Sequence, residues 1–237
     1  MSLPASIQRV ELADLRGATR AGFSASEAAA VLRGDSPVPA VPPPERVQIA
    51  DTTSPDLGSV GALTMLAPRL RRRIDMTFIA CRAWRADHRE LAIAHMKEAK
   101  RAPSPAFIAA AAAEIAAVAL AMFGAGAFDA VASIACGHSR TAECMGKQLA
   151  VATAEALGTP YRKLFADRFL MGVSHPKEFK NLPPLAWCAD PIGRTLVVDD
   201  IATSGWHLKE ALDLIRARGR AASALVWIGG ELRTDGL

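Results

Sequence analysis

The stretch that decides the fold is Leu196-Val-Val-Asp-Asp-Ile-Ala-Thr-Ser-Gly-Trp-His-Leu208. Its apolar, β-branched beginning, Thr195 to Val198, predicts a strand, and the polar residues 199–205 predict a loop. Leu208 to Arg218 has helical spacing and is followed by a glycine, and Ala224 to Ile228 predicts a further strand. This order is that of a βαβ unit, whose loop lies at the carboxyl edge of a parallel sheet, where such folds bind ligands.

The loop itself combines acidic, hydroxyl and glycine residues. Asp199 and Asp200 stand at the strand end and offer acceptors to vicinal hydroxyls or to the water shell of a metal ion. The following residues supply hydroxyls, a flexible backbone and a helix dipole, namely Thr203, Ser204, Gly205 and a helix that starts near His207. The stretch predicts a site that holds a diol beside a phosphate. The alternative is a strand, turn and helix in which the acids only cap the helix.

This pattern resembles the phosphoribosyl-diphosphate (PRPP) signature of type I phosphoribosyltransferases. The resemblance implies that Asp199 and Asp200 contact the ribose hydroxyls, and that they are the candidate residues for Mg²⁺. It also implies a loop around the 5′-phosphate formed by Ala202, Thr203, Ser204, Gly205, Trp206 and His207. Trp206 and His207 replace the usual small residue and Thr, and a protonated imidazole could replace the lost hydroxyl with a charge-assisted bond.

Two further segments extend the resemblance. A predicted strand, Phe128 to Ala135, leads into Cys136-Gly-His-Ser-Arg-Thr141 and then into a helix over Glu143 to Leu157. In the family this turn binds the diphosphate, which implies roles for His138, Ser139 and, above all, the guanidinium of Arg140.

The polar and basic insertion 171–181 corresponds to a loop that closes over PRPP in the family, with Lys177 and Lys180 as candidates. The alternative for this insertion is an ordinary exposed loop.

Over residues 78–230 the order of elements is most similar to the competence-type (ComF-like) phosphoribosyltransferase proteins, in which a helix with a basic residue near Lys97 precedes the diphosphate strand. The expected fold is therefore α/β, a phosphoribosyltransferase-like parallel sheet flanked by helices, with a small helical N-terminal extension. Val10 to Arg33 and the proline-rich run 34–45 form that extension, so we expect a boundary near residue 46, with domains 1–46 and 47–237.

The segment between the linker and the diphosphate strand is expected to contain several elements. Val47 to Arg73 is interpreted as an extended piece, a turn and a helix that ends in an arginine cluster. Met76 to Trp84 predicts a strand and Asp87 to Lys100 a helix. Ala106 to Gly124 imitates a membrane span, but it is rich in alanine and carries Glu114, so a buried helix is expected.

Composition and charge favour a cytoplasmic protein. The chain has a net charge of +4 and is 51% hydrophobic, which suits an anionic ligand without indicating nucleic acid. No secretory signal is visible, and the 4 cysteines contain no CxxC pair, which argues against a disulfide scaffold and a zinc ribbon.

The sequence thus predicts a Mg²⁺-dependent transferase that joins a phosphoribosyl group to a nucleobase or another nitrogen acceptor. Its partners are PRPP and that acceptor, with a homodimer implied by resemblance and no membrane partner. Two alternatives stay open: a catalytically silent PRPP or nucleotide sensor linked to DNA uptake or regulation, and a DNA-binding module that uses Val10 to Arg33 and the arginine cluster.

Overall fold

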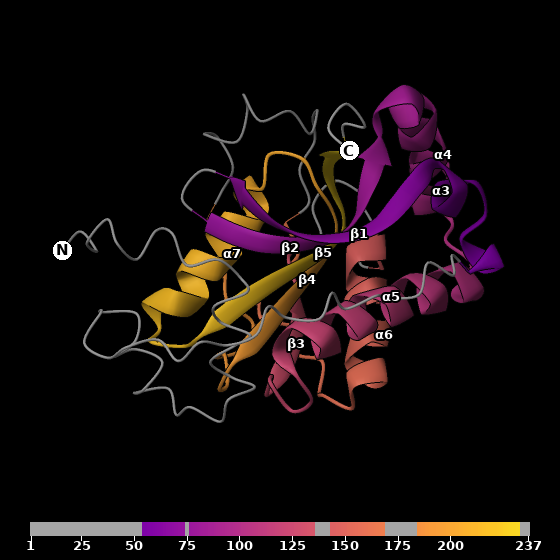
Figure 1. Ribbon diagram of the computed structural model, residues 1–237. Coiled ribbons are helices and arrows are strands. Elements are labelled where there is room, and N and C mark those ends of the chain that lie inside the picture. Colours follow the sequence, from indigo (N-terminus) through magenta and orange to yellow (C-terminus); the bar gives the residue numbers. More distant parts are fainter. Residues whose placement is uncertain (1–53, 74–75, 136–142, 169–183, 233–237) are drawn as a thin grey trace, which may run out of the picture. The chain divides into compact units, whose positions relative to one another are not determined.

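A computed structural model describes residues 54–73, 76–135, 143–168 and 184–232 of the 237-residue chain. These residues form an α/β fold around a mixed sheet with the strand order β1-β2-β5-β4-β3 (Figure 1). The strands are β1 (Thr64–Arg73), β2 (Met76–Arg85), β3 (Ala130–Ser133), β4 (Thr195–Ala202) and β5 (Ala222–Leu232). Strands β2, β5, β4 and β3 run parallel, and β1 lies antiparallel to β2 at the edge.

Helices cover both faces of the sheet. They are α3 (Gly58–Leu63), α4 (Arg89–Arg101), α5 (Pro105–Phe123), α6 (Met145–Leu157) and α7 (Trp206–Ala217), with short 3₁₀ turns at Pro55–Leu57 and Ala86–His88. Neighbouring residues of β5 show the two layers: Val226 packs in the cluster that contains Leu212 of α7, whereas Trp227 makes an edge contact with Phe107 of α5. A strand buried on both faces explains the nearly unbroken apolar sequences of β4 and β5.

The α/β class that the sequence predicts is confirmed, and β2, α4, α6, β4, α7 and β5 all occur where elements of their type were expected. Strand β4 continues through both acids to Ala202, so it is longer than predicted, and α7 begins at Trp206. The acids therefore belong to the end of a strand, which fixes their backbone more firmly than a loop would.

The prediction for the residues before β2 was wrong. The expected turn at Gly58 and Gly61 is helix α3, and the expected helix that ends in the arginine cluster is strand β1. Pro68 lies where the β1–β2 register shifts, between Leu66 and Arg69, which is a position that a strand allows to proline. Pairing with β2 outweighs the weak local preference of an arginine-rich run.

Helix α5 occurs as predicted but is buried only in part: Ile115 and Val118 are buried, whereas Leu120 is 45% exposed. Ser104 caps the helix by accepting a hydrogen bond from the Phe107 N–H at 3.1 Å, and Pro105 occupies the first turn. Of the described helices, it alone is long and apolar enough to cross a membrane. Its one acid, Glu114, accepts hydrogen bonds from Arg82 at 2.5 Å and from the Trp227 indole N–H at 2.8 Å, so the carboxylate is paired inside the protein.

The predicted N-terminal helix, the proline-rich linker and the boundary near residue 46 lie outside the described residues. They stay predictions.

Candidate functional site

The site lies at the carboxyl end of β4. Asp199 and Asp200 are the fifth and sixth residues of this strand, and Asp199 pairs in register with Val226 of the parallel strand β5. Ala202 ends the strand, and only three residues separate it from α7. The acids and the helix N-terminus therefore sit at the same edge of the sheet, as the βαβ order predicts.

Lys100, near the C-terminus of α4, forms an ion pair with Asp200. Its ammonium lies 2.9 Å from Oδ1 and 2.8 Å from Oδ2 of Asp200, so it contacts both carboxylate oxygens. The Asp200 side chain is 8% exposed, whereas that of Lys100 is 39% exposed. Burial lowers the pKa of Lys100, but attraction to Asp200 and the hydrogen bond outweigh it and leave the pKa raised. Lys100 therefore stays protonated, and solvent still reaches its side chain.

Asp199 has the opposite electrostatic state. Burial and the neighbouring Asp200 raise the pKa of Asp199 to about 8, although Lys100 and the Asp200 N–H work against this shift. That N–H donates to Asp199 Oδ1 at 2.9 Å. The raised pKa favours a protonated Asp199 at neutral pH beside the Asp200–Lys100 ion pair, because two carboxylates this close do not both ionise easily.

Gly146 of helix α6 lies close to the Asp199 carboxyl group. A Cβ placed on Gly146 would lie 3.0 Å from Asp199 Oδ1, which is closer than an ordinary van der Waals contact. A side chain at this position would therefore press on the carboxyl group.

The acid pair suits a diol better than it suits a metal ion alone. Protonated Asp199 donates and accepts hydrogen bonds, and ionised Asp200 accepts them, which matches two neighbouring hydroxyls. Among the described residues there is no group of three or more metal-binding side chains, and Asp200 already pairs with Lys100. Cys144 is disulfide-bonded, so it does not supply a thiolate ligand.

The turn from β4 into α7, which the sequence predicts to hold a phosphate, follows the acid pair. Gly205 has φ 76° and ψ 3°, a left-handed conformation that glycine adopts without strain, and it is the N-cap of α7. A glycine N-cap has no side chain to accept from the first N–H groups of the helix, which leaves them for water or an anion. Thr203 is exposed and Ser204 partly exposed, so both residues are open to solvent just before these amides in the chain.

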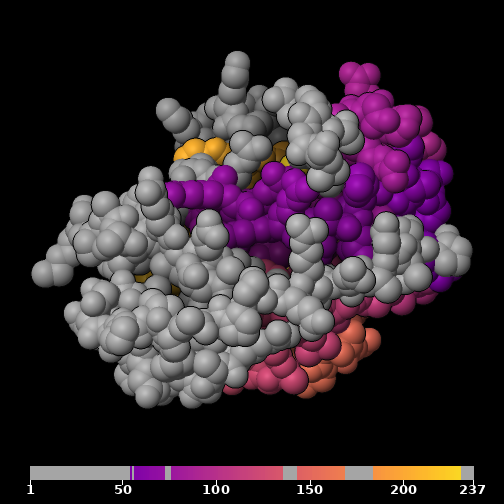
Figure 2. Space-filling model, in the orientation of Figure 1, coloured from indigo at the N-terminus to yellow at the C-terminus, as the bar shows by residue number. Residues whose placement is uncertain are grey.

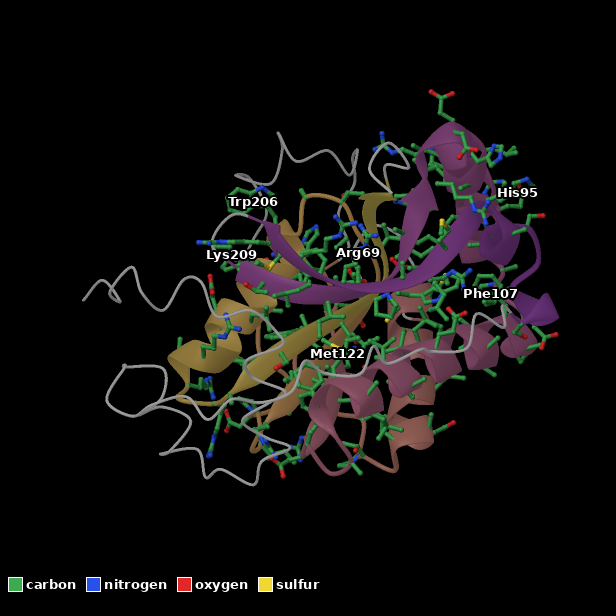
Figure 3. All side chains as sticks on the ribbon, in the orientation of Figure 1. Arg69, His95, Phe107, Met122, Trp206 and Lys209 are labelled. Carbon is green, nitrogen blue, oxygen red and sulfur yellow. The ribbon has the colours of Figure 1, made fainter. Side chains whose placement is uncertain are left out.

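The two residues that depart from the family pattern have different environments. Trp206 is 46% exposed at the start of α7, where Figure 3 also shows Lys209 one turn further along. His207 Nδ1 lies 3.0 Å from Nη2 of Arg168. Since a guanidinium only donates, Nδ1 accepts and the ring hydrogen belongs on Nε2, which fits a neutral imidazole.

Arg168 holds this histidine as part of a larger network. Its guanidinium forms two hydrogen bonds with Glu210 of α7, at 3.1 and 3.0 Å, and its side chain is 8% exposed. Glu210 also accepts from the Leu185 backbone N–H at 3.2 Å. The network ties the first turn of α7 to both ends of the segment that separates Arg168 from Leu185.

Several predicted site residues lie outside the described residues: His138, Ser139, Arg140, Lys177 and Lys180. The described residues before it show where the chain enters the turn that the sequence predicts to bind diphosphate. Strand β3 ends at Ser133, which pairs in register with Val198, the residue before Asp199. The chain therefore enters the turn from the strand beside the acid pair.

Sequence reasoning missed Lys100, Arg168 and Glu210. A signal existed for Lys100, because the resemblance singled out a basic residue near Lys97, and Lys100 follows one helical turn later. No local pattern distinguishes Arg168 and Glu210, which are 42 residues apart in the chain.

Comparison with known proteins gives a limited result. No family model and no curated protein matches the sequence. Among solved structures, the chain is similar to the orotate phosphoribosyltransferase from Aeropyrum pernix, with a TM-score of 0.34 and 19% identity over 73% of this chain and 78% of that chain. A similarity of this size does not indicate which reaction the chain catalyses.

Proposed function

We propose that the chain is a phosphoribosyltransferase that binds PRPP and transfers its phosphoribosyl group to a nitrogen acceptor with release of diphosphate. The observation that carries the proposal is the acid pair with its lysine near the end of β4, followed by the glycine N-cap of α7, Gly205, five residues after Asp200. A diol site beside an anion site is what a ribose 5-phosphate needs.

In this proposal the two halves of the site bind the two ends of the sugar. Asp199 and Asp200 hold the ribose hydroxyls, and the amides and hydroxyls from Ala202 to His207 hold the 5′-phosphate. Lys100, which is partly exposed, supplies positive charge next to the acids and offsets part of the repulsion that a highly charged anion meets there.

The diphosphate end would be held by residues predicted from the sequence. Arg140, with Ser139 and His138, is proposed to bind the diphosphate in the turn after β3, and Lys177 to approach it from the segment 171–181. Mg²⁺ would neutralise charge on the diphosphate when bound. Since Mg²⁺ commonly combines one or two carboxylates with substrate phosphates, the acid pair fits it only together with PRPP.

The chemical step needs no nucleophile from the protein. The lone pair of the acceptor nitrogen forms a bond to C1 of the ribose, while the C1–O bond to diphosphate breaks and its electron pair leaves on the diphosphate oxygen. The chain positions both partners and stabilises charge on the leaving group.

A second candidate function is a PRPP or nucleotide sensor that binds without turnover. The observation that favours it is the pairing of His207 with Arg168, because a neutral ring held in this way supplies no charge to the phosphate in place of the family threonine. The exposed Trp206 likewise brings no hydroxyl to the loop.

Diphosphate release separates these candidates. Wild-type protein is incubated with PRPP, Mg²⁺ and each of a panel of nucleobases, and released diphosphate is measured. The transferase proposal expects base-dependent release that Asp200→Asn abolishes and that Asp87→Asn, at a side chain 71% exposed, leaves unchanged. Binding of PRPP without release for any base supports the sensor, and neither binding nor release contradicts both.

A further inference from the structure

Trp206 is the exposed tryptophan of the described residues. It is 46% exposed, whereas Trp84 and Trp227 are 5% and 0% exposed. Trp187 is partly buried, and the guanidinium of Arg218 lies 4.5 Å from the centroid of its ring. Within the part of the chain that the structure describes, no hydrogen bond or ring contact involves Trp206. Its indole therefore offers water a large apolar face that a flat ligand can cover.

The position of Trp206 brings this face to the predicted phosphate loop. Trp206 is the first residue of α7, directly after the N-cap Gly205. Side chains of a helix lean toward its N-terminus, so the indole leans toward the loop and away from the later turns. Figure 3 shows Trp206 at the upper end of α7, and Figure 2 shows orange atoms of this part of the chain at the molecular surface, in the upper left of the view.

The loop itself presents no positive side chain to a phosphate. Within residues 202–207 only His207 can carry a positive charge. Its Nδ1 accepts from Arg168, and Arg168 in turn forms two hydrogen bonds with Glu210, which matches the charge of the arginine. A terminal phosphate carries about 1.5 to 2 negative charges at neutral pH, whereas a phosphate with a second ester bond carries about one. The loop therefore suits the lower charge of a phosphodiester.

We propose that the site also binds a ribose 5-phosphate whose phosphate carries a second nucleotide, and that the base of this nucleotide stacks on Trp206. The terminal ribose lies at Asp199 and Asp200 and its phosphate at the loop, a placement that rests on the proposed function. The added nucleotide continues past the loop to the exposed indole, which stacks on a base whatever hydrogen-bonding groups the base carries. A nucleoside diphosphate-ribose has this chemistry, with a free ribose, singly charged phosphates and an aromatic base. It competes with PRPP for the ribose site.

Three probes separate the parts of such a ligand. ADP-ribose has the free ribose, the phosphates and a base beyond them, and ribose 5-phosphate lacks that base. AMP carries its base at C1, on the opposite side of the ribose from the phosphate. Each probe is titrated calorimetrically into the full chain, and PRPP with Mg²⁺ is titrated with and without ADP-ribose. We expect ADP-ribose to bind at least 10-fold more tightly than ribose 5-phosphate or AMP, and to compete with PRPP.

Variants of Trp206 test whether stacking causes the difference. Trp206→Ala is expected to weaken ADP-ribose at least 10-fold and to leave ribose 5-phosphate unchanged, whereas Trp206→Phe keeps an aromatic face and most of the affinity. Leu91→Ala, at a side chain 51% exposed on α4, is the control and leaves every affinity unchanged. Fluorescence gives a second measurement: ADP-ribose quenches tryptophan emission of wild type and not of Trp206→Phe, because Trp206 is the indole that the ligand covers.

The outcomes distinguish this inference from the proposed function. PRPP binding together with equal affinities for ADP-ribose and ribose 5-phosphate overturns the inference alone. It is also overturned if AMP binds as tightly as ADP-ribose, if ADP-ribose does not compete with PRPP, or if Trp206→Ala binds ADP-ribose as wild type does. Binding of ADP-ribose that depends on Trp206, without any binding of PRPP, removes the transferase and leaves the nucleotide site. Failure of PRPP and of all three probes contradicts both.

Discussion

Two ion pairs in this protein use the same chemistry in different surroundings. Arg82 and Glu114 join β2 to α5, with side chains 0% and 10% exposed, and Trp227, Thr64 and the Gly61 carbonyl satisfy further atoms of the pair. Lys100 and Asp200 join α4 to β4, with the lysine 39% exposed. The first pair is sealed inside the fold, and the second opens to solvent at the edge of the sheet.

The difference separates a pair that is closed to ligands from a pair that a ligand could reach. Arginine forms several fixed bonds at once, which suits a buried partner, whereas a lysine ammonium on a flexible stem can change partners. A ligand that binds Asp200 needs Lys100 to adjust, and its partial exposure allows that. A ligand cannot enter between Arg82 and Glu114, because both side chains are buried.

The largest expected effect is on the sealed pair. Arg82→Met leaves the Glu114 carboxylate buried without its cation, so we expect a loss of about 3 to 5 kcal/mol in the free energy of unfolding. Denaturant titration followed by circular dichroism measures it. Arg85→Met, at an exposed arginine of the same strand, is the matched control and should change stability by less than about 0.5 kcal/mol. Equal stability of the two variants would mean that the buried pair does not stabilise the fold.

The open pair is expected to act on binding more than on stability. Lys100→Met should weaken PRPP at least 10-fold, about 1.4 kcal/mol, because the ligand then meets the acids without a nearby cation. The unfolding free energy should fall by less than in Arg82→Met, since solvent reaches the lysine of this pair at the edge of the sheet.

Calorimetric titration of PRPP with Mg²⁺ measures the change, and Lys97→Met, at an exposed lysine of the same helix, serves as the control. An affinity for PRPP that is unchanged or tighter in Lys100→Met would show that Lys100 only blocks the acid pair.

The stability of the fold is also expected to depend on pH. The pKa of Asp199 rises from 3.8 to about 8 on folding, so the folded state binds more protons between these values. Its contribution is complete below pH ~4 and is lost as the pH rises through about 8, with a slope of at most ~1.4 kcal/mol per pH unit. Asp199→Asn should flatten the stability profile between pH 4 and 8, and an identical slope in the variant would contradict the assignment.

The smallest expected change in stability comes from Gly146→Ala. Alanine favours the helix by up to about 1 kcal/mol, but its Cβ would press on Asp199 Oδ1. We therefore expect a thermal midpoint within a few degrees of wild type together with weaker PRPP binding. If Gly146→Ala is as stable as wild type and binds PRPP as tightly, PRPP binding does not depend on the exact position of the Asp199 side chain.

The sequence predicted the elements whose signals are close together along the chain. The apolar run before Asp199 and the glycine before α7 are neighbours in the chain, so their pattern predicts the βαβ unit, which the structure confirms, and a site at its edge that stays a prediction. Strand β1 was missed because its structure depends on pairing with β2 and not on its arginine-rich sequence. Lys100 could not be assigned to Asp200, because 100 residues separate them and only the folded chain brings them together.

The most direct test of the acid-pair site is a calorimetric titration of PRPP with Mg²⁺ into wild-type protein and into Asp200→Asn. The asparagine keeps the shape of the side chain but removes the charge that pairs with Lys100 and accepts from the ribose hydroxyls. We expect saturable binding by wild type and at least 100-fold weaker binding by the variant, about 2.7 kcal/mol. No binding by folded wild type, or equal binding by both proteins, would contradict the assignment of the β4 edge as a ribose-phosphate site.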